Sequence, residues 1–371
     1  MTHAHWAVRS DHGLLSSIEP ETLWKTLDTL LPSSLLPILQ AVNAGQALQA
    51  ILTDYPLTNI DNSDLCSEPY ANFTESQQEM IFMFYAYLAC AWVGMGHQQI
   101  PADVSQALVQ LGDILERPPM LGYAGMVLNN WQLKDKTQDF SPENIALFLR
   151  FTDLMDESWF FRVHIAIEAQ AGEMLRALID VQEAIADNDE QAVLVYLRQM
   201  NTGLVQITKT FHKMPELCDP DVYYQQIRPF LMSFDDNIIF EGIEPNPTPL
   251  RGGSGAQSSI VPIMLAGLNV DHQSSQLTAN LKDMQRYMPR DHRQLIAQMQ
   301  ENKLRGYCQQ YPHLSDAYNQ VLRQLITFRR AHLYYARTYI FEKSTNPIGT
   351  GGTEYMSFLS KLIDETANQM L

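Results

Sequence analysis

Apolar side chains recur every three to four residues along most of this chain, the spacing of a helix that turns one face toward a core. The clearest case is residues 322–341, LRQLITFRRAHLYYARTYIF. One stripe of this helix carries Leu322, Leu325, Ile326, Arg329, His332, Tyr335, Ala336, Tyr339 and Ile340. His332 is therefore expected to point into the interior. No alternating pattern of useful strand length occurs, so we predict an all-α fold.

The same periodicity, with its start and stop signals, predicts the remaining helices. Prolines at 20, 32, 37 and 56 should break residues 1–70 into short helices. Ser76, with Glu79 three residues on, is a plausible capping pair for a helix that is apolar nearly all round. The helices expected beyond residue 70 are 76–96, 101–116, 139–151, 158–187, 189–214, 220–234 with a stop or bend at Pro229, 260–268, 277–288, 291–300, 315–341 and 355–371.

Residues 241–259, EGIEPNPTPLRGGSGAQSS, form the one long stretch without helical or strand periodicity. A loop of this length is usually functional or disordered, and its prolines and the apolar helix that follows favour order. Gly252, Gly253 and Gly255 permit close approaches that a side chain would prevent. The loop lacks a GK[ST] ending and a preceding strand, so it is not a nucleotide-binding fingerprint.

Length and charge limit the possible partners. A chain of 371 residues exceeds the usual size of a single core, so we expect two domains or one domain with a substantial cap. Hydrophobic residues make up 46% and charged residues 18%, as in ordinary soluble globular proteins. The 25 Lys and Arg against 42 Asp and Glu give a net charge of −17, which argues against binding to nucleic acid or an anionic membrane.

Cysteines and terminal sequences indicate where the protein works. Cys66, Cys90, Cys218 and Cys308 are far apart and match no CxxC or zinc spacing, so we interpret them as free thiols. The chain shows no signal-peptide pattern and no apolar run approaching about 18 residues. We therefore expect a cytosolic protein. Scattered histidines near the N-terminus more often belong to a mobile tail than to a metal site; they are His3, His5 and His12.

Four candidate groups allow both a structural and a functional interpretation. His332 is either a core histidine bonded to a carbonyl or an axial ligand to a haem iron. The face with Tyr123, Met126, Val127 and Trp131 is either core or a pocket wall. The aromatic run 159–161, one turn before His164, either anchors its helix or stacks on a planar ligand. Arg228, among aromatic residues, needs a fixed anionic partner, which is an internal carboxylate or a bound ligand.

Four ordered stretches resemble one family. They are YAGMVLNNW at 123–131, WFF at 159–161, RGGSGAQSS at 251–259, and FRRAHLYYARTYI at 328–340 followed by GTGGT. In these stretches the chain resembles the indoleamine 2,3-dioxygenases, haem enzymes that open the indole ring of tryptophan with O2. The match runs from about residue 70 to the C-terminus. It implies a small helical domain, residues 1–140, that caps the distal side of a large haem-binding domain, residues 141–371.

The resemblance also implies a role for individual residues. It makes His332 the proximal ligand of haem b, with Arg329 near a propionate. It makes Arg228 the group that grips the substrate carboxylate. Its substrate pocket contains Tyr123, Met126, Val127, Phe160 and Tyr223. Its closing loop contains Gly253 and Ser254 beside the cofactor and Gly255 beside the substrate. It places Thr353 in a turn associated with the substrate ammonium.

Two departures from the mammalian members bear on the substrate. His164 stands where those members have a small serine, and Tyr223 replaces their phenylalanine. His164 is our candidate catalytic group: it would hydrogen-bond the indole N–H, as a distal histidine does in tryptophan 2,3-dioxygenases. It would otherwise ligate the iron as a sixth ligand, or favour a different indole.

The favoured hypothesis is a dioxygenase that converts L-tryptophan or a related indole, with O2, to N-formylkynurenine. It requires an electron donor, whose identity the sequence leaves open, that keeps the iron ferrous. Two alternatives are a haem sensor or store without turnover and an enzyme for a modified indole.

Overall fold

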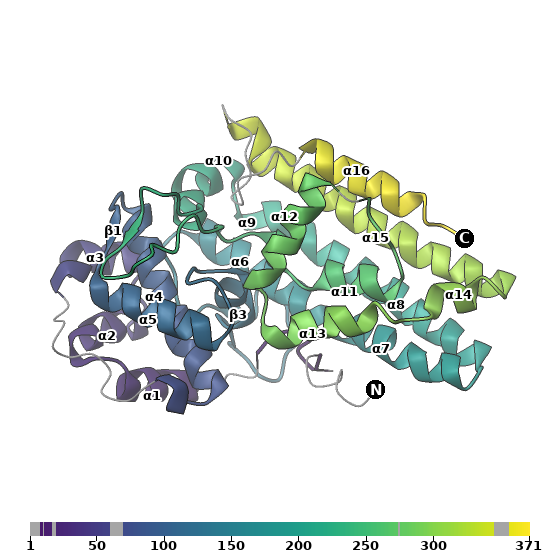
Figure 1. The fold of residues 1–371 in the computed structure, drawn as a ribbon, viewed down its shortest axis with the longest axis horizontal. Helices are drawn as coiled ribbons and strands as arrows, with labels where there is room; N and C mark the ends of the chain where they lie inside the picture. The colour runs from purple at the N-terminus through teal and green to yellow at the C-terminus, as the bar shows by residue number, and fades with distance from the viewer. Residues whose placement is uncertain (1–7, 10, 17–19, 60–69, 274, 345–355) are drawn as a thin grey trace.

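The structure is a computed structural model that describes residues 8–9, 11–16, 20–59, 70–273, 275–344 and 356–371. Helices dominate it, so the predicted all-α fold is confirmed (Figure 1). The strands of the described part are two residues long and form two separate pairs. These are β1 (Gln99–Ile100) parallel to β4 (Ile239–Phe240), and β2 (Gln132–Leu133) antiparallel to β3 (Ile145–Ala146).

One end of the molecule is built around a helix that is apolar nearly all round and buried at most positions (Figure 1). This helix is α4 (Glu75–Gly94). Its capping box uses Thr74 and Gln77, so the predicted pair of Ser76 and Glu79 was wrong by two residues. The other helices of this end are α1 (Pro20–Leu30), α2 (Leu36–Asn43), α3 (Leu48–Asp54) and α5 (Ala102–Ile114).

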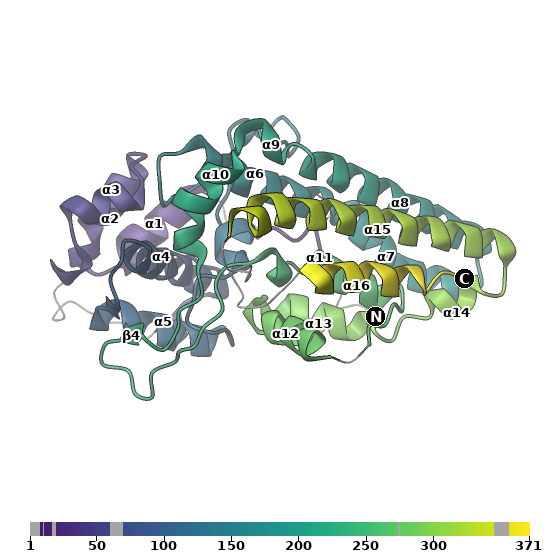
Figure 2. The same cartoon turned by 90° about the horizontal axis from the view of Figure 1, so that it is seen from above.

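The other end consists of long helices that run lengthwise beside one another, with short ones packed against them (Figure 2). The long helices are α6 (Met155–Gln170), α7 (Gly172–Ala186), α8 (Glu190–Phe211), α15 (Pro312–Tyr339) and α16 (Met356–Ala367). The shorter helices are α9 (Met214–Leu217), α10 (Pro220–Val222), α11 (Ile260–Gly267), α12 (Gln276–Met284), α13 (Arg290–Met299) and α14 (Leu304–Cys308). The helix expected over 315–341 thus begins three residues earlier, at Pro312, a favoured first helical position.

The single helix expected over 158–187 is two helices that meet at Ala171. The N-terminal segment crosses this junction. A Cβ atom at Gly13 would lie 2.1 Å from the carbonyl oxygen of Glu168, and one at Gly172 would lie 2.9 Å from Cα of Gly13. Glycine at both positions therefore permits backbone to pack on backbone.

The helix expected over 139–151 was wrong, because turns and β3 occupy this stretch. The side-chain amide of Asn144 donates to the carbonyl oxygens of Asp135 at 2.9 Å and Asp139 at 3.1 Å. The side-chain oxygen of Asn130 accepts from the backbone N–H groups of Phe148 and Leu149. These local bonds satisfy the backbone without a helix, and periodicity does not reveal them.

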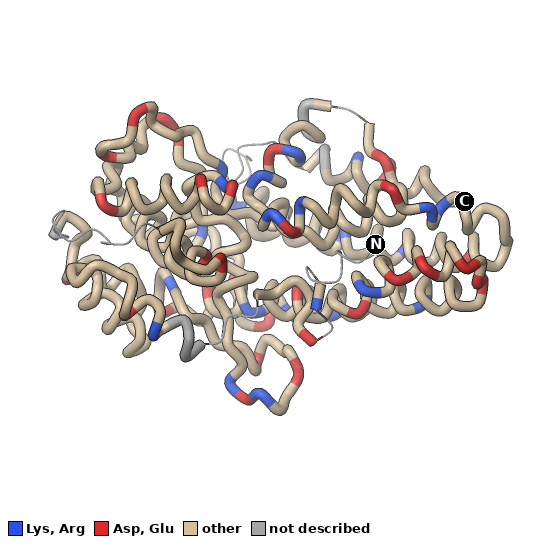
Figure 3. The backbone as a smooth tube through the Cα atoms, turned by 60° about the horizontal axis from the view of Figure 1, so that its bottom comes forward, with Lys and Arg blue, Asp and Glu red and all other residues tan. Residues whose placement is uncertain are grey.

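The surface carries mixed charge. Figure 3 shows Lys and Arg interspersed with Asp and Glu along the coloured part of the chain. Cys90, Cys218 and Cys308 are buried free thiols, whereas Cys66 lies outside the described residues. In the described part of the chain, every helix is too short or too polar to cross a membrane.

Candidate functional site

Two cavities meet beside the middle of α6, at His164. The larger has a volume of about 760 Å³ and lies among α6, α11, α12, α15 and α16. The smaller, about 120 Å³, is bounded by α6, α15 and two short helical turns. Five residues line both cavities and so mark their junction: Tyr123, His164, Phe211, Gly255 and His332. The larger volume falls in the range of pockets that bind small molecules and cofactors.

His332 lies on α15 with its ring at this junction. Its ring nitrogens make no hydrogen bond to any described residue. Burial, together with the charges of His164 and Arg329, lowers the pKa of His332 to about 4. The imidazole is thus neutral at pH 7 and keeps a lone pair, as a metal ligand requires. The interpretation of His332 as a core histidine bonded to a carbonyl does not fit this geometry.

His164 faces the same junction from α6. Its Nδ1 lies 2.8 Å from the carbonyl oxygen of Phe160, one turn earlier. Because a carbonyl only accepts, we assign the proton to Nδ1, which leaves the Nε2 lone pair free. Burial lowers the pKa of His164, partly offset by this bond. His164 therefore presents a neutral acceptor within a ring of aromatic side chains, with Tyr123 at 6.2 Å and Phe211 at 6.0 Å between ring centroids.

Two π-helical turns contribute to the wall of the small cavity. They are η6 (Ala124–Leu128) and η7 (Tyr223–Ile227), and the latter leads into a 3-10 turn, η8 (Arg228–Leu231), where Pro229 bends the chain as expected. Such turns are rare and occur often at functional sites. The structure brings together the five side chains that the resemblance assigns to the substrate pocket: Tyr123, Met126, Val127, Phe160 and Tyr223.

The glycine-serine loop, residues 251–259, closes the small cavity from one side. Gly253, Ser254 and Gly255 line this cavity, and a Cβ atom at Gly255 would lie 3.9 Å from Nε2 of His332. The loop is ordered, as predicted, and Gln257 fixes it. The Gln257 side chain accepts from the backbone N–H of Tyr123 at 2.9 Å and donates to the carbonyl of Gly252 at 3.1 Å.

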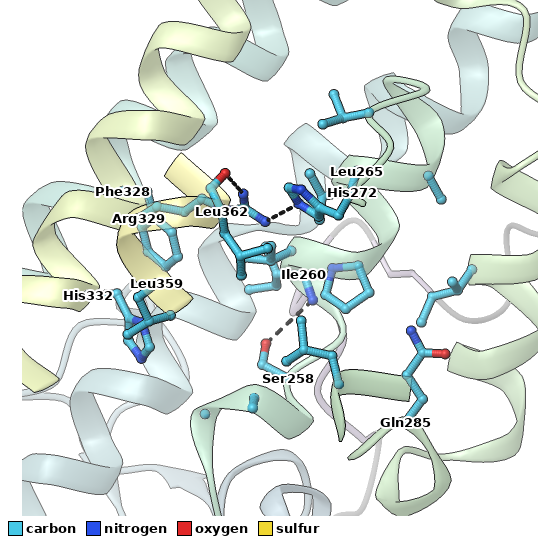
Figure 4. A pocket seen from close by; sticks show the side chains of 18 of the residues that line it. Ser258, Ile260, Leu265, His272, Gln285, Phe328, Arg329, His332, Leu359 and Leu362 are labelled. Atoms are coloured by element: carbon cyan, nitrogen blue, oxygen red, sulfur yellow. Dashed lines mark hydrogen bonds between the residues drawn. The ribbon is translucent and has the colours of Figure 1, made fainter. Parts of the chain in front are cut away.

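Arg329 lines the large cavity and is anchored to α16 (Figure 4). Its Nη1 donates to the carbonyl of Leu362 at 2.8 Å and to Oγ1 of Thr366 at 2.5 Å. Its Nη2 lies 3.1 Å from Nε2 of His272. Nδ1 of His272 in turn lies 2.8 Å from Oε2 of Glu365. Sequence reasoning missed His272 and Glu365, which no motif marks.

Among the described residues, Arg228 and Trp131 are two candidates that do not line either of these cavities. Arg228 is buried, with its guanidinium 5.1 Å from the ring centroid of Tyr224. Thr353 lies outside the described residues. Among the three N-terminal histidines, His12 alone is described; it is buried, 3.0 Å from Asp11 and close to the ring of Trp131. His12 therefore does not belong to a mobile tail.

Glu168 is a further cavity residue that sequence reasoning missed. It lies one turn after His164 on α6, lines the large cavity and is fully buried. Its Oε1 accepts a 2.6 Å hydrogen bond from Oγ of Ser258. Burial raises the pKa of Glu168 to about 7. The i, i+4 spacing of Phe160, His164 and Glu168 is the signal that could have found it.

The donor set fits haem better than a bare metal ion. Within the described residues, no group of three or more His, Cys, Asp or Glu side chains is placed to chelate a metal. A haem iron needs only one imidazole from the protein because the porphyrin supplies four ligands. His332 is such an imidazole, and Gly255 leaves the space beside its Nε2 without a side chain. The residues present therefore fit haem ligated by His332.

Comparison with known proteins identifies related sequences. A family model described as indoleamine 2,3-dioxygenase matches residues 5–348. Indoleamine 2,3-dioxygenase 1 of Rattus norvegicus is 27% identical over 325 residues, which cover 79% of this chain and 80% of the rat protein. Indoleamine 2,3-dioxygenase nanC of Aspergillus nanangensis is 26% identical and covers 91% of this chain and 88% of its own. Indoleamine 2,3-dioxygenase 2 of Homo sapiens is 27% identical, with 80% of each chain covered.

Proposed function

The chain belongs to the indoleamine 2,3-dioxygenase family, and from this premise we propose that it is a haem enzyme that cleaves the indole C2–C3 bond of L-tryptophan or a close analogue. Its relatives are named as dioxygenases, so the chain is an oxidoreductase. The product from L-tryptophan would be N-formylkynurenine. One observation carries the proposal: a neutral imidazole, that of His332, faces the junction of two cavities without a hydrogen-bond partner among the described residues.

Haem b would occupy the large cavity with His332 as its protein ligand and Arg329 close to a propionate. When bound, the haem iron supplies the chemistry of O2, which protein side chains lack. Apolar side chains of the large cavity, among them Leu265, Phe328 and Leu362, would contact the porphyrin. Three donors of Arg329 are engaged by Leu362, Thr366 and His272, so its guanidinium is held in a fixed orientation.

The indole would occupy the small cavity, where the side chains orient it. Phe160 and Tyr223, whose ring centroids are 4.6 Å apart, offer aromatic faces, and the turn η6 closes the opposite wall. Nε2 of His164 would accept the indole N–H and so fix which edge of the ring faces the large cavity. Proper orientation removes much of the entropic barrier to reaction.

The amino-acid end of the substrate needs groups for both of its charges. We propose that Arg228 binds the carboxylate, since a planar guanidinium matches it with two hydrogen bonds. Arg228 follows η7 directly, and Tyr223 of that turn lines the small cavity. Gly255, at the junction of the cavities, and Thr353 would lie beside the substrate, the latter near its ammonium. His164 would position the indole rather than act as an obligatory base.

A second candidate function is supported by the placement of the two histidines. His164 and His332 line the same two cavities, and each presents a free ring nitrogen. Both could bind one iron, which would give a haem sensor or store without turnover. A low-spin bis-histidine spectrum of the ferrous protein that persists with tryptophan present would favour this alternative.

Anaerobic reduction of the haem-reconstituted protein, followed by L-tryptophan and O2, tests the proposal. We expect N-formylkynurenine, identified by mass, to form with turnover. If haem is bound but tryptophan does not react, the substrate is another indole or the bis-histidine alternative holds. Product analysis across indole compounds tests the first of these. His332→Ala should lose haem or its normal spectrum, and an unchanged spectrum would refute the ligand assignment.

A further inference from the structure

Glu168 links two parts of the site that lie far apart in sequence. It is the third member of the row Phe160, His164 and Glu168 on α6, and it has no exposed surface. Its Oε1 accepts from Oγ of Ser258 at 2.6 Å, whereas its Oε2 has no hydrogen-bond partner in the described part of the chain. Tyr123 is a neighbour whose pKa is coupled to that of Glu168. Ser258 belongs to the glycine-serine loop, whereas Tyr123 precedes η6, the turn that walls the small cavity.

These contacts act on the part of the loop that closes the site. Ser258 directly follows the turn η9 (Gly255–Gln257). In this turn, the side-chain oxygen of Gln257 accepts a hydrogen bond from the backbone N–H of Tyr123 at 2.9 Å. Gly255, at the start of the same turn, lines the junction of the cavities, where a Cβ atom on it would lie 3.9 Å from Nε2 of His332. A shift of Ser258 would therefore move Gly255 and change the space left for a substrate.

We propose that Glu168 is a positioning residue that holds the glycine-serine loop against the small cavity through Ser258, more firmly when its carboxyl is ionised. The expected effect of Glu168 on substrate binding rests on the proposed function, whereas its expected effect on the position of the loop does not. Hydrogen bonds to an ionised carboxylate are shorter and about twice as strong as those to a neutral acceptor. The Ser258 hydroxyl can donate, so ionisation of the carboxyl strengthens this contact.

The ionisable groups around Glu168 have pKa values that differ from its own. Tyr123 is the ionisable neighbour coupled to it, and burial raises the pKa of Tyr123 far above neutrality. His164 on its own helix and His292 of α13, which bonds Ser259, both have pKa values lowered by burial. In the N-terminal segment that packs on its backbone, Asp11 pairs with His12 and Arg9. Arg329 keeps its charge, and the pKa of His332 is about 4. Burial raises the pKa of Glu168 to about 7, and it does the same for Glu157 near the start of the same helix. A transition near pH 7 that disappears in Glu168→Gln therefore belongs to Glu168.

Three variants of the full-length holoprotein test the inference. Glu168→Gln keeps the shape and an acceptor but removes the titration. Ser258→Ala removes the donor from the loop. Ser259→Ala is the matched control, because this neighbouring hydroxyl bonds to His292 at 3.0 Å rather than to Glu168. Thermal unfolding of each variant confirms that it is folded before comparison.

The first measurement is amide hydrogen exchange of the peptide 251–259, compared among the proteins at one pH of about 8. We expect about 10-fold faster exchange in Glu168→Gln and Ser258→Ala than in the wild type, since each lacks a charge-assisted hydrogen bond. Ser259→Ala should exchange in this peptide more slowly than those two. Equal exchange in all four proteins would overturn the inference, whatever the protein does to tryptophan.

The second measurement separates KM from kcat for L-tryptophan between pH 6 and pH 8. In the wild type we expect KM to fall several-fold as pH rises through about 7, with a smaller change in kcat. Glu168→Gln and Ser258→Ala should lose this dependence, and Ser259→Ala should keep it. If KM of Glu168→Gln depends on pH as it does in the wild type, Glu168 does not have the proposed positioning role. Absence of turnover in every protein, with the exchange differences present, would instead refute the proposed substrate and retain the loop contact.

Discussion

Nη2 of Arg329 lies 3.1 Å from Nε2 of His272, and this contact fixes the protonation of the histidine. A guanidinium only donates, so Nε2 accepts and the proton resides on Nδ1, which donates to Glu365 at 2.8 Å. Burial and the charge of Arg329 lower the pKa of His272, in agreement with this assignment. The chain of contacts joins α15, the segment after α11 and α16 at the wall of the large cavity.

His272→Ala should therefore loosen the hold on haem. Arg329 loses one of its three partners and Glu365 loses a donor, and a hydrogen bond to a charged group contributes about 1.5 to 3 kcal/mol. We expect haem to transfer to apomyoglobin about 10-fold faster or more than from the wild type. His313→Ala is the control, since His313 is an exposed residue of the same helix α15. Identical transfer rates in the two variants would contradict this role of His272.

The free energy of unfolding of the haem-free protein should fall as pH drops below 6.5. The pKa of His332 is about 4 in the folded protein against 6.5 ordinarily, so the unfolded chain binds more protons between these values. This difference corresponds to a loss of up to about 3 kcal/mol by pH 4. His332→Gln, compared with the wild type by urea unfolding at pH 7 and pH 4.5, should lose less stability over this interval. An equal loss in both proteins would show that His332 is accessible to protons in the folded state.

Much of the fold was predictable because helix periodicity is a local signal. The stripe through His332, the glycine-serine loop and the pocket residues of α6 all follow from residues close in sequence. The stretch 139–151 was mispredicted because Asn144 and Asn130 bond its backbone, and a periodic pattern carries no information about side-chain amides. The division at residue 140 stays a prediction.

The missed site residues depend on contacts between distant segments. The i, i+4 row of Phe160, His164 and Glu168 places Glu168 on the cavity face, but its contact with Ser258, 90 residues later, appears only in the structure. His272 gains meaning from Glu365, 93 residues away. A lone His in a loop sequence has no pattern that distinguishes it from a surface residue, so sequence reasoning had no reason to select His272.

Two adjacent glycines should respond differently to alanine. A Cβ atom at Gly252 would lie 2.1 Å from the carbonyl oxygen of Leu231, which belongs to the backbone and cannot move alone. One at Gly253 would lie 2.3 Å from Cε of Met126, the end of a flexible side chain. Gly253→Ala should thus lose about 1 to 3 kcal/mol of stability and raise KM as Met126 shifts within the cavity wall. Gly252→Ala should lose more stability than Gly253→Ala in thermal unfolding, and the reverse order would contradict the packing described.

His164 should decide whether the substrate must carry an indole N–H. Its Nδ1 is bonded to Phe160 at 2.8 Å, so its neutral Nε2 is an acceptor, and a substrate methylated on the indole nitrogen cannot donate to it. An unpaired buried acceptor costs about 1 to 3 kcal/mol, so the wild type should prefer tryptophan over the methylated analogue by at least about 10-fold in kcat/KM. His164→Ala should bring the ratio of the two kcat/KM values close to one, because it removes the acceptor and makes room for the methyl group. Since the pKa of His164 is lowered, the wild-type preference should also weaken only below pH 6.5, where Nε2 gains a proton. A preference that survives in His164→Ala would mean that Nε2 does not face the indole nitrogen. If the wild type has a low-spin spectrum that disappears in this variant, Nε2 of His164 is instead a ligand of the iron.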